Sequence, residues 1–256
     1  MSEDTATVGA EISLTFQKGL RVLEAYLDGS VSLSSSEIAT RTGLNRSVAR
    51  RLIRTLVQAG YLTEDRGRYA MTVRVLRLTQ GFTGGRGLAQ VIQPILRLAS
   101  HDIGDAVSFS MQDETEAVYV AHAFMPSRFT LNRVTVGSRV PLLPTAVGRA
   151  ILAFLPEDEA DRIQTAVPPP LYTEQTETRL PVIRTLLAET RAAGYAYVQS
   201  EYVEGVSSLA VPVFRPDGAV VGAVSVIFSQ GEHNDQDRSR IVTRLRQCSA
   251  DVGASF

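Results

Sequence analysis

The sequence predicts a two-domain α+β protein, with an N-terminal winged helix-turn-helix, a linker helix and a C-terminal domain built on an antiparallel sheet. Between residues 33 and 71, two short amphipathic segments are separated by a glycine and followed by a hairpin pattern. Glycines then gather between residues 81 and 87, which is typical of a joint. From residue 107 onward the apolar residues follow the spacing of strands.

The charge is divided unevenly along the chain. The 256 residues are enough for two separate cores. Residues 1–86 hold 12 Lys/Arg against 8 Asp/Glu, whereas the remainder holds 14 against 19. A basic first domain suits a surface that binds phosphate. We expect a disordered tail over residues 1–12, the winged helix-turn-helix over 13–73, a linker over 74–87 and the second domain over 88–256.

A tight turn between two helices is the centre of the first domain. Ser35 or Ser36 is expected to cap the helix before the turn, and Gly43 to end it, because glycine readily adopts the left-handed conformation. Asn45 is expected to cap the next helix. Its buried stripe is predicted to be Val48, Leu52, Leu56 and Val57. An earlier helix over residues 14–27 should bury Phe16, Leu20, Leu23 and Leu27.

The helix that follows Gly43 carries arginines and small polar residues on its outer face. Such a helix fits the major groove of DNA, where its first turns reach base edges. A solvated basic face would show the same charges. The preceding turn, and an Arg-bearing hairpin of strands 61–63 and 68–71 around the turn 64–67, favour DNA binding. The predicted DNA-binding residues are Ser36, Asn45, Arg46, Ser47, Arg50, Arg51, Arg54, Arg66 and Arg68.

The linker is expected to contain a helix over residues 73–79 and a flexible joint at Gly81, Gly84, Gly85 and Gly87. A helix over 88–103 should face inward with Val91, Ile95, Leu98 and Ala99, and Pro94 predicts a kink or a late start. Strands are predicted at 107–111, 117–121, 129–136, 195–200, 207–214 and 219–229, and helices at 145–154, 157–166, 180–193 and 235–252. This order predicts an antiparallel sheet covered by helices.

Signals of catalysis are missing from the sequence. It contains no nucleophile elbow, no P-loop and no dinucleotide-binding glycine pattern. His101, His122 and His233 lack the spacing of metal ligands. An enzyme with a DNA-binding appendage is therefore disfavoured, and we expect neither a cofactor nor a metal.

The compartment can be predicted from the cysteine count and the N-terminus. Cys248 is the only cysteine, so an intrachain disulfide is impossible and a reducing compartment is favoured. The polar N-terminus lacks the features of a signal peptide, and no apolar run approaches the ~20 residues of a membrane span. We expect a cytoplasmic protein without a membrane partner.

Two serines inside apolar strand patterns, Ser208 and Ser225, indicate a small-molecule pocket. A buried hydroxyl needs a hydrogen-bond partner, and neighbouring backbone could supply one for either serine alone. The small residues that follow Thr145 open a predicted helix, whose free N–H groups suit a carboxylate. The three features together favour a pocket for a small acid.

Three motifs follow the winged helix in order: Gly137-x-x-x-Pro141-Leu142, Thr145-Ala146-x-Gly148-Arg149-Ala150-x-Leu152-Ala153-Phe154 and Glu201-x-x-x-Gly205-Val206-x-Ser208-Leu209-Ala210-Val211-Pro212. This order resembles the IclR family of bacterial transcription regulators and extends over residues 14–252. The resemblance implies a DNA-reading domain, a GAF-like effector domain, and a homodimer or homotetramer on double-stranded operator DNA. The last motif is similar to that of members governing the catabolism of aromatic acids such as protocatechuate and 4-hydroxybenzoate.

The residues expected to bind the effector are Phe129, Leu131, Asn132, Arg133, Val140, Ala146, Val147, Val198, Ser208, Ser225 and Ile227. The chain departs from the family pattern at three of the pocket positions. An acidic residue common near Val198 is missing, Ser208 replaces a cysteine, and Ile227 replaces a serine. This more apolar pocket favours an aromatic carboxylic acid. A small aliphatic oxo-acid, or an interaction module that does not read DNA, are the alternatives.

Overall fold

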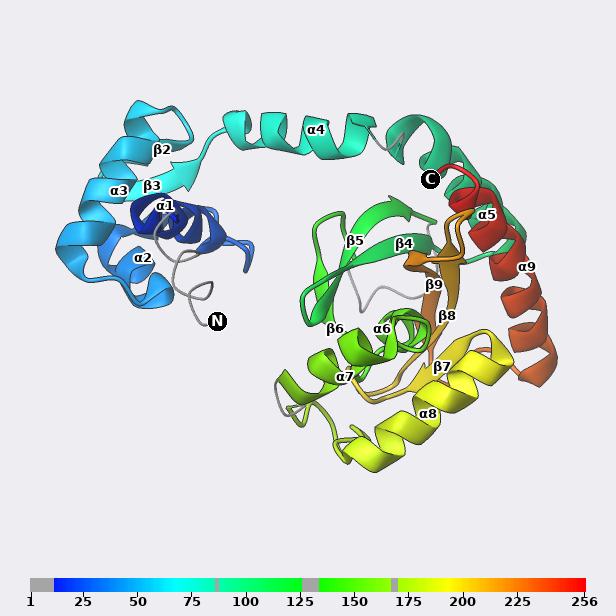
Figure 1. The fold of residues 1–256 in the computed structure, drawn as a ribbon. Coiled ribbons are helices and arrows are strands. Elements are labelled where there is room, and N and C mark those ends of the chain that lie inside the picture. Colours follow the sequence, from blue (N-terminus) through cyan, green and yellow to red (C-terminus); the bar gives the residue numbers. More distant parts are fainter. Residues whose placement is uncertain (1–11, 86–87, 126–133, 167–169) are drawn as a thin grey trace, which may run out of the picture. The chain divides into compact units, whose positions relative to one another are not determined.

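A computed structural model describes residues 12–85, 88–125, 134–166 and 170–256 of the chain (Figure 1). Contacts divide the chain into two compact units, Met1–Phe82 and Thr83–Phe256. The predicted two-domain α+β class is confirmed. None of the helices formed by the described residues combines the length and apolar character that crossing a membrane requires.

The first unit is a winged helix-turn-helix with a small antiparallel sheet of order β1-β3-β2. Its core joins the three helices to β1, β2 and β3. The helices are α1 (Leu14–Glu24), α2 (Ser35–Thr42) and α3 (Arg46–Gln58), and the strands are β1 (Leu33–Ser34), β2 (Leu62–Asp65) and β3 (Arg68–Met71).

Capping side chains fix the turn between α2 and α3. The Glu37 N–H donates to Ser34 Oγ at 3.2 Å, and the Ser34 N–H donates to Glu37 Oε2 at 2.7 Å. The predicted caps Ser35 and Ser36 are therefore wrong, because only Ser34 has a glutamate three residues later with which to form this reciprocal pair. Gly43 ends α2 with a φ of 66°, as predicted. The Asn45 carboxamide oxygen accepts the Val48 N–H at 2.9 Å and caps α3, also as predicted.

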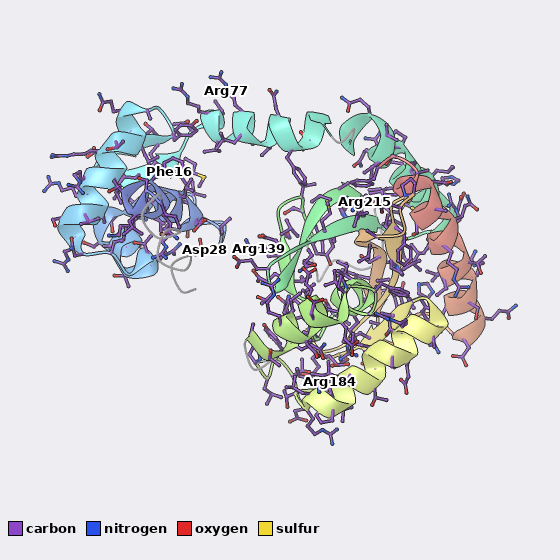
Figure 2. The ribbon with its side chains drawn as sticks, viewed as in Figure 1. Phe16, Asp28, Arg77, Arg139, Arg184 and Arg215 are labelled. Carbon is purple, nitrogen blue, oxygen red and sulfur yellow. The ribbon has the colours of Figure 1, made fainter. Side chains whose placement is uncertain are left out.

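The buried stripe predicted for α1 is wrong. Val22 and Tyr26 are buried, whereas Phe16, labelled in Figure 2, is 68% exposed. Of the four predicted residues only Leu23 packs against the core, and Leu20 and Leu27 are exposed. Apolar residues occur on two sides of this helix, so their spacing alone predicts the helix but not the side that is buried.

In α3 the buried stripe is centred on Ala49, Leu52 and Ile53. Of the predicted stripe only Leu52 is fully buried, and Val48, Leu56 and Val57 pack partly buried at its edges. The predicted buried stripe is therefore wrong, because it is shifted by about one residue along α3 from the observed one. The arginine-bearing side of α3 remains the side that faces away from this core.

The wing is a hairpin with a two-residue turn. Asp65 pairs with Arg68, and the two residues between them, Arg66 and Gly67, both have positive φ (49° and 78°). Turns with two positive φ angles match the twist of a β-ribbon. The predicted turn over 64–67 was too long, because β2 continues to Asp65.

The linker is helical, with a short 3-10 turn η1 (Val73–Val75) followed by α4 (Leu76–Gly85). Gly81, Gly84 and Gly85 lie within α4, so the flexible joint predicted at these positions is wrong. A glycine inside a helix costs only about 1 kcal/mol relative to alanine, which the surrounding residues can offset. Gly87, the fourth glycine of the predicted joint, lies outside the described residues.

The second unit contains a six-stranded antiparallel sheet of order β6-β5-β4-β9-β8-β7. Helices α5 and α9 pack side by side on one face of the sheet, and α6, α7 and α8 lie against the other (Figure 1). The strands are β4 (Val107–Asp113), β5 (Glu116–Ala123), β6 (Arg139–Pro141), β7 (Ala196–Gln199), β8 (Val206–Phe214) and β9 (Val220–Ser229). The helical segments are η2 (Leu88–Ile92), α5 (Gln93–Ile103), α6 (Ala146–Leu152), α7 (Glu157–Ala166), α8 (Leu180–Ala193) and α9 (Asp235–Gly253).

The inward face predicted for the helix over residues 88–103 is wrong. The inward face of α5 is formed by Leu96, Ala99 and Ile103, whereas Leu98 is exposed, as is Val91 in η2. Of the predicted residues Ala99 is buried and Ile95 partly so. Pro94 lies in the first turn of α5, which confirms the predicted late start.

The strand predicted over 129–136 is also wrong where the structure describes it. Residues 134–136 lead into a turn at Gly137 (φ 90°), in which the Ser138 N–H donates to Thr135 O at 3.0 Å. The outer neighbour of β5 is instead β6, in the register Ala117 opposite Val140, while β4 pairs with the other edge of β5.

The alternation of side chains along β8 and β9 leaves space under α6. Large residues such as Leu209 and Phe228 face α5 and α9. On the opposite face, Ser208 lies across from Ile227 and Ala210 lies across from Ser225. Small side chains on this face do not fill the volume between the sheet and α6, so a cavity can form there.

Gly148 allows α6 to approach the segment before it. A Cβ added at Gly148 would lie 2.0 Å from the carbonyl oxygen of Leu142, which is a backbone atom. We predict that Gly148→Ala lowers the free energy of unfolding of the second unit by about 1–3 kcal/mol or more, since the backbone must shift. Gly81→Ala is the control, because an added Cβ there meets nothing within 4 Å. Urea unfolding that shows equal stability for wild type and Gly148→Ala would contradict the prediction.

Candidate functional site

A row of basic side chains covers the outer face of α3. Arg46, Arg50 and Arg54 recur every four residues and therefore lie along one side of the helix, with Arg51 beside them. All four are exposed, and none has an acidic partner among the described residues. Unpaired arginines on an exposed helix can bind phosphate oxygens or the edges of guanine.

The other predicted DNA-binding residues are also exposed, but differ in their contacts. Ser47 donates from its hydroxyl to Asn45 Oδ1 at 2.8 Å, at the N-terminal end of α3. Arg66 projects from the tip of the wing, while Arg68 donates to Ser32 Oγ at 2.9 Å and to Ser32 O at 2.7 Å. These two hydrogen bonds attach the wing strand β3 to Ser32, so part of the Arg68 guanidinium is already engaged within the protein. Ser36 lies exposed in the first turn of α2.

The second unit contains a cavity of about 40 Å³ between the sheet, the start of α6 and the loop after β7. The seven predicted effector residues that the structure describes all line it: Val140, Ala146, Val147, Val198, Ser208, Ser225 and Ile227. Phe129, Leu131, Asn132 and Arg133 lie outside the described residues. The structure therefore brings together, in one cavity, residues that are up to 87 positions apart in the sequence (Val140 to Ile227).

Several lining residues were not predicted from the sequence. They are Tyr119, Pro144, Thr145, Glu201, Tyr202, Val203 and Val206. Glu201 and Val206 belong to the third motif, so their place in that motif was the available signal. Tyr119 lies in a strand whose alternate residues are buried, a pattern that does not distinguish a core residue from a pocket residue.

The polar groups inside the cavity are few. Ser225 Oγ is buried and has no hydrogen-bond partner among the described residues. Thr145 is already engaged, because its hydroxyl donates to Pro141 O at 2.7 Å and accepts the Gly148 N–H at 3.2 Å. The N–H groups of Ala146 and Val147 open α6 and so have no acceptor within the helix. A buried hydroxyl without a partner costs about 1–3 kcal/mol, which a bound polar group can recover.

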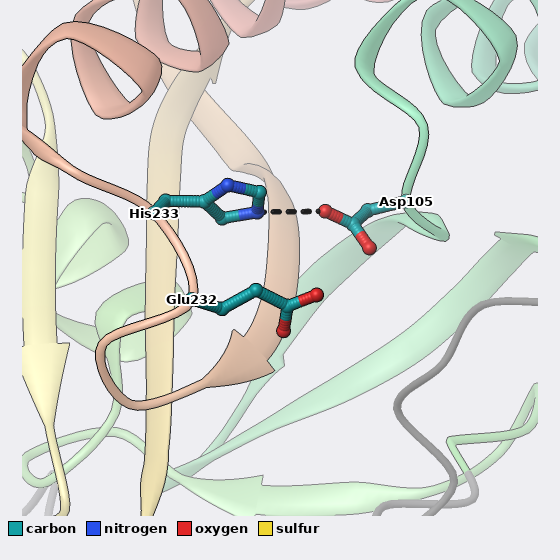
Figure 3. A group of neighbouring side chains, drawn as sticks. All are labelled: Asp105, Glu232 and His233. Carbon is teal, nitrogen blue, oxygen red and sulfur yellow. Dashed lines mark hydrogen bonds and ion pairs between the residues drawn. The ribbon is translucent and has the colours of Figure 1, made fainter.

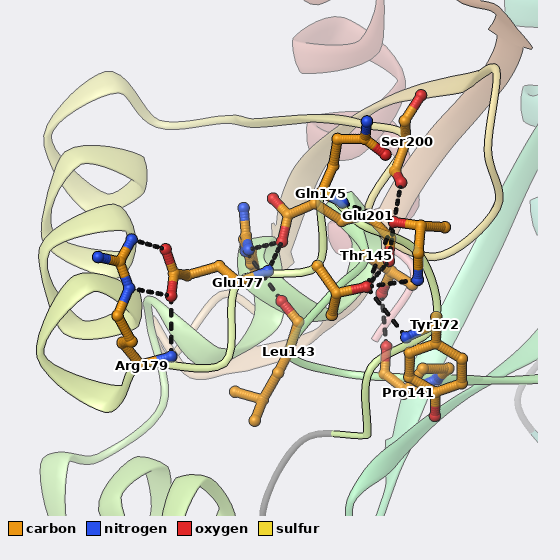
Figure 4. A network of polar contacts seen from close by, with 12 residues as sticks. Pro141, Leu143, Thr145, Tyr172, Gln175, Glu177, Arg179, Ser200 and Glu201 are labelled. Carbon is orange, nitrogen blue, oxygen red and sulfur yellow. Dashed lines mark hydrogen bonds and ion pairs between the residues drawn. The ribbon is translucent and has the colours of Figure 1, made fainter.

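A buried ion pair joins the lining residue Glu201 to Arg149, which lies behind the cavity wall. Arg149 on α6 donates to Glu201 Oε2 at 2.6 Å and to Leu143 O at 2.9 Å (Figure 4). The same glutamate oxygen accepts the Glu177 N–H at 3.1 Å. The side chains of Arg149 and Glu201 are only 4% and 12% exposed. Since both charges are removed from water, each depends on the other for compensation.

The loop after β7 is held to the segment before α8 by hydroxyl groups. Thr173 Oγ1 donates to Ser200 O at 2.5 Å, and Thr176 Oγ1 donates to Glu201 O at 2.6 Å. Tyr202 packs edge-on against Tyr172, with ring centroids 4.9 Å apart. These contacts fix the loop that carries Glu201, Tyr202 and Val203 against the cavity.

Two other groups with possible chemistry have structural roles. Burial raises the pKa of the Cys248 thiol to about 12, so it stays protonated and unreactive at neutral pH. The His233 ring meets Asp105 Oδ2 at 3.0 Å and packs edge-on against Phe228, with Glu232 beside them (Figure 3). This contact joins the turn before β4 to the start of α9.

The chain joins a winged helix that carries unpaired arginines to a domain that contains a partly apolar cavity. This combination defines the class of DNA-binding proteins that respond to a small molecule. Residues 15–66 match the IclR helix-turn-helix domain, and residues 80–254 match the bacterial transcriptional regulator IclR C-terminal domain. The chain belongs to the IclR family of bacterial transcriptional regulators. It is therefore a transcriptional regulator, not an enzyme.

Individual relatives include regulators of aromatic pathways. The p-hydroxybenzoate hydroxylase transcriptional activator of Acinetobacter baylyi is 30% identical over 219 residues, which cover 81% of this chain and 78% of that protein. The Pca operon regulatory protein of the same species is 28% identical over 213 residues, covering 82% and 77%. An IclR homolog from Microbacterium hydrocarbonoxydans, solved in complex with 4-hydroxybenzoate, has the same fold with a TM-score of 0.80, 22% identity and coverage of 94% and 98%.

The buried ion pair generates a prediction about stability. Replacing Arg149 by methionine should lower the free energy of unfolding by about 3–5 kcal/mol, because it leaves Glu201 buried without its counter-charge. Arg184→Met is the matched control: the Arg184–Asp161 pair (3.1 Å) is about half exposed, and losing it should cost under about 1 kcal/mol (Figure 2). Equal losses for the two variants in urea unfolding would show that the buried pair has no special role.

Proposed function

We propose that this regulator binds an aromatic carboxylic acid, such as 4-hydroxybenzoate or protocatechuate, in the cavity of its second unit, and that the acid modulates operator binding. The observation that carries the proposal is the cavity itself, with apolar walls and an unpartnered Ser225 hydroxyl. An apolar pocket with a few convergent polar groups is typical of small-molecule sites.

The apolar walls of the cavity can pack against the aromatic ring of the proposed effector. Val140, Val198 and Ile227 line the cavity, and burying apolar ligand surface against them would contribute about 25 cal/mol per Å². The carboxylate would take hydrogen bonds from the hydroxyls of Ser208 and Ser225 and from the N–H groups that open α6. Phe129, Leu131, Asn132 and Arg133 remain part of the proposed site.

The names of the relatives support the same effector class. One is an activator for p-hydroxybenzoate hydroxylase and another regulates the Pca operon, and each aligns with over four-fifths of this chain. The volume of about 40 Å³ favours the alternative, a small aliphatic oxo-acid, because it has room for only about three water molecules. An aromatic acid requires the lining side chains to move apart.

For DNA, we propose that α3 enters the major groove and the wing contacts the backbone. The support is the unpaired arginine row on α3 and the exposed Arg66 at the wing tip. One such helix reads only a short stretch of groove, so we infer at least a homodimer on a roughly palindromic site. A monomer by light scattering, both free and on DNA, would contradict this.

Arg50→Ala should weaken binding to DNA from the protein's own promoter region by ~1–3 kcal/mol if Arg50 reads a base. Its side chain is exposed in the middle of the arginine row. Arg240→Ala removes the same charge from an exposed position on α9 and should leave the affinity unchanged. Both are measured by gel-shift titration at one fixed salt concentration. A salt-independent shift, or equal affinities for wild type and Arg50→Ala, would count against DNA reading through Arg50.

Calorimetry should show binding of 4-hydroxybenzoate and protocatechuate to the wild-type protein, and weaker or no binding of pyruvate. The reason is that pyruvate cannot use the apolar walls around Val198 and Ile227. If pyruvate binds and no aromatic acid does, the aliphatic alternative is correct and the apolar interpretation of these walls is wrong.

A further inference from the structure

Glu201 is an unusual residue for the wall of a pocket that receives an acid. It lines the cavity together with Tyr202 and Val203 from the same loop. An ionised carboxylate repels a second carboxylate, so a bound acid has to keep its own charge away from Glu201. The group that meets Glu201 must then be neutral, and the favourable choice is a hydrogen-bond donor.

The two oxygens of Glu201 differ in their surroundings. Oε2 accepts from Arg149 at 2.6 Å and from the Glu177 N–H at 3.1 Å. Both of these hydrogen bonds go to Oε2, and none of the described residues donates to Oε1. A carboxylate oxygen can accept two hydrogen bonds, so Oε1 retains the capacity to accept from a ligand.

The position of this oxygen is fixed before any ligand arrives. The Glu201 carbonyl accepts from Thr176 Oγ1 at 2.6 Å, and the side chain is held by Arg149. Ser200, in the left-handed region with φ 53°, accepts the Gly205 N–H at 3.0 Å through its hydroxyl, which itself donates to Gln230 Oε1 at 2.6 Å. A preorganised acceptor loses little entropy on binding and therefore discriminates strongly between ligands.

We propose that Glu201 determines specificity by accepting a hydrogen bond from a ring hydroxyl, so that the cavity selects hydroxylated aromatic monocarboxylic acids over unsubstituted ones. This inference rests on the proposed aromatic effector. Tyr119 and Tyr202 also line the cavity and can donate to the oxygen of the same hydroxyl. Burial, and secondarily the nearby Tyr202, raise the pKa of Tyr119, so its phenol stays neutral and able to donate.

The test compares ligands that differ only in the donor. Wild-type protein is titrated calorimetrically with 4-hydroxybenzoate, benzoate and 4-methylbenzoate, in which a methyl group replaces the hydroxyl at similar size. We expect 4-hydroxybenzoate to bind roughly tenfold or more tightly than either analogue, because a site built to hydrogen-bond a hydroxyl rejects ligands that lack it.

The same titrations are made with Glu201→Gln. Arg149 and the Glu177 N–H are both donors, so the amide oxygen should turn toward them and leave an NH2 group in place of the free acceptor. The preference for 4-hydroxybenzoate should then fall to within about threefold. Benzoate affinity should not decrease, because the variant removes the negative charge that repels its carboxylate. The matched control is Glu204→Gln, an exposed glutamate of the same loop outside the cavity lining, which should keep the wild-type preference.

Three results would overturn the role of Glu201. They are an unchanged preference in Glu201→Gln, an equal loss of affinity for all three acids in that variant, or equal wild-type affinities for 4-hydroxybenzoate and 4-methylbenzoate. The last comparison needs no variant and therefore holds even if Glu201→Gln does not fold. If no aromatic acid binds the wild type, the proposed effector class itself is wrong.

Discussion

The proposed effector pocket depends on the buried ion pair between Arg149 and Glu201. It joins α6, whose first N–H groups line the cavity, to the loop that closes the cavity after β7. Either charge alone would be left in a low-dielectric interior at a cost of several kcal/mol. The pair therefore ties the loop after β7 to α6, and the threonine contacts at Ser200 and Glu201 reinforce this attachment.

Packing constraints place the pair where it is. Gly148 brings α6 against the Leu142 carbonyl, which in turn positions Arg149, the next residue, toward Leu143 and Glu201. On the sheet, Ala210 and Ser225 face each other across β8 and β9 under α6. Small residues at these positions keep space open, whereas the opposite face of the same strands is filled by the large core residues that pack on α5 and α9.

Local signals in the sequence predicted much of this structure. Gly43 and Asn45 specify the turn before α3 by their own backbone and capping preferences. Ser208 and Ser225 could be predicted as pocket residues because a buried hydroxyl inside an apolar strand needs a hydrogen-bond partner. The buried sides of α1 and α5 were not predictable, because apolar residues occur on both sides of each helix. The loop that carries Glu201 and Tyr202 is held at the cavity by contacts with residues distant in sequence, such as Thr173, Thr176 and Arg149, which no local pattern encodes.

The proposed function requires that occupation of the cavity and binding to DNA are coupled in one equilibrium. The most direct test measures the operator Kd without and with saturating 4-hydroxybenzoate, and the 4-hydroxybenzoate Kd without and with operator, at one salt concentration. We expect both affinities to change by the same factor, of about fivefold or more, because coupling free energies are reciprocal. An operator affinity that stays constant while the acid demonstrably binds would contradict it.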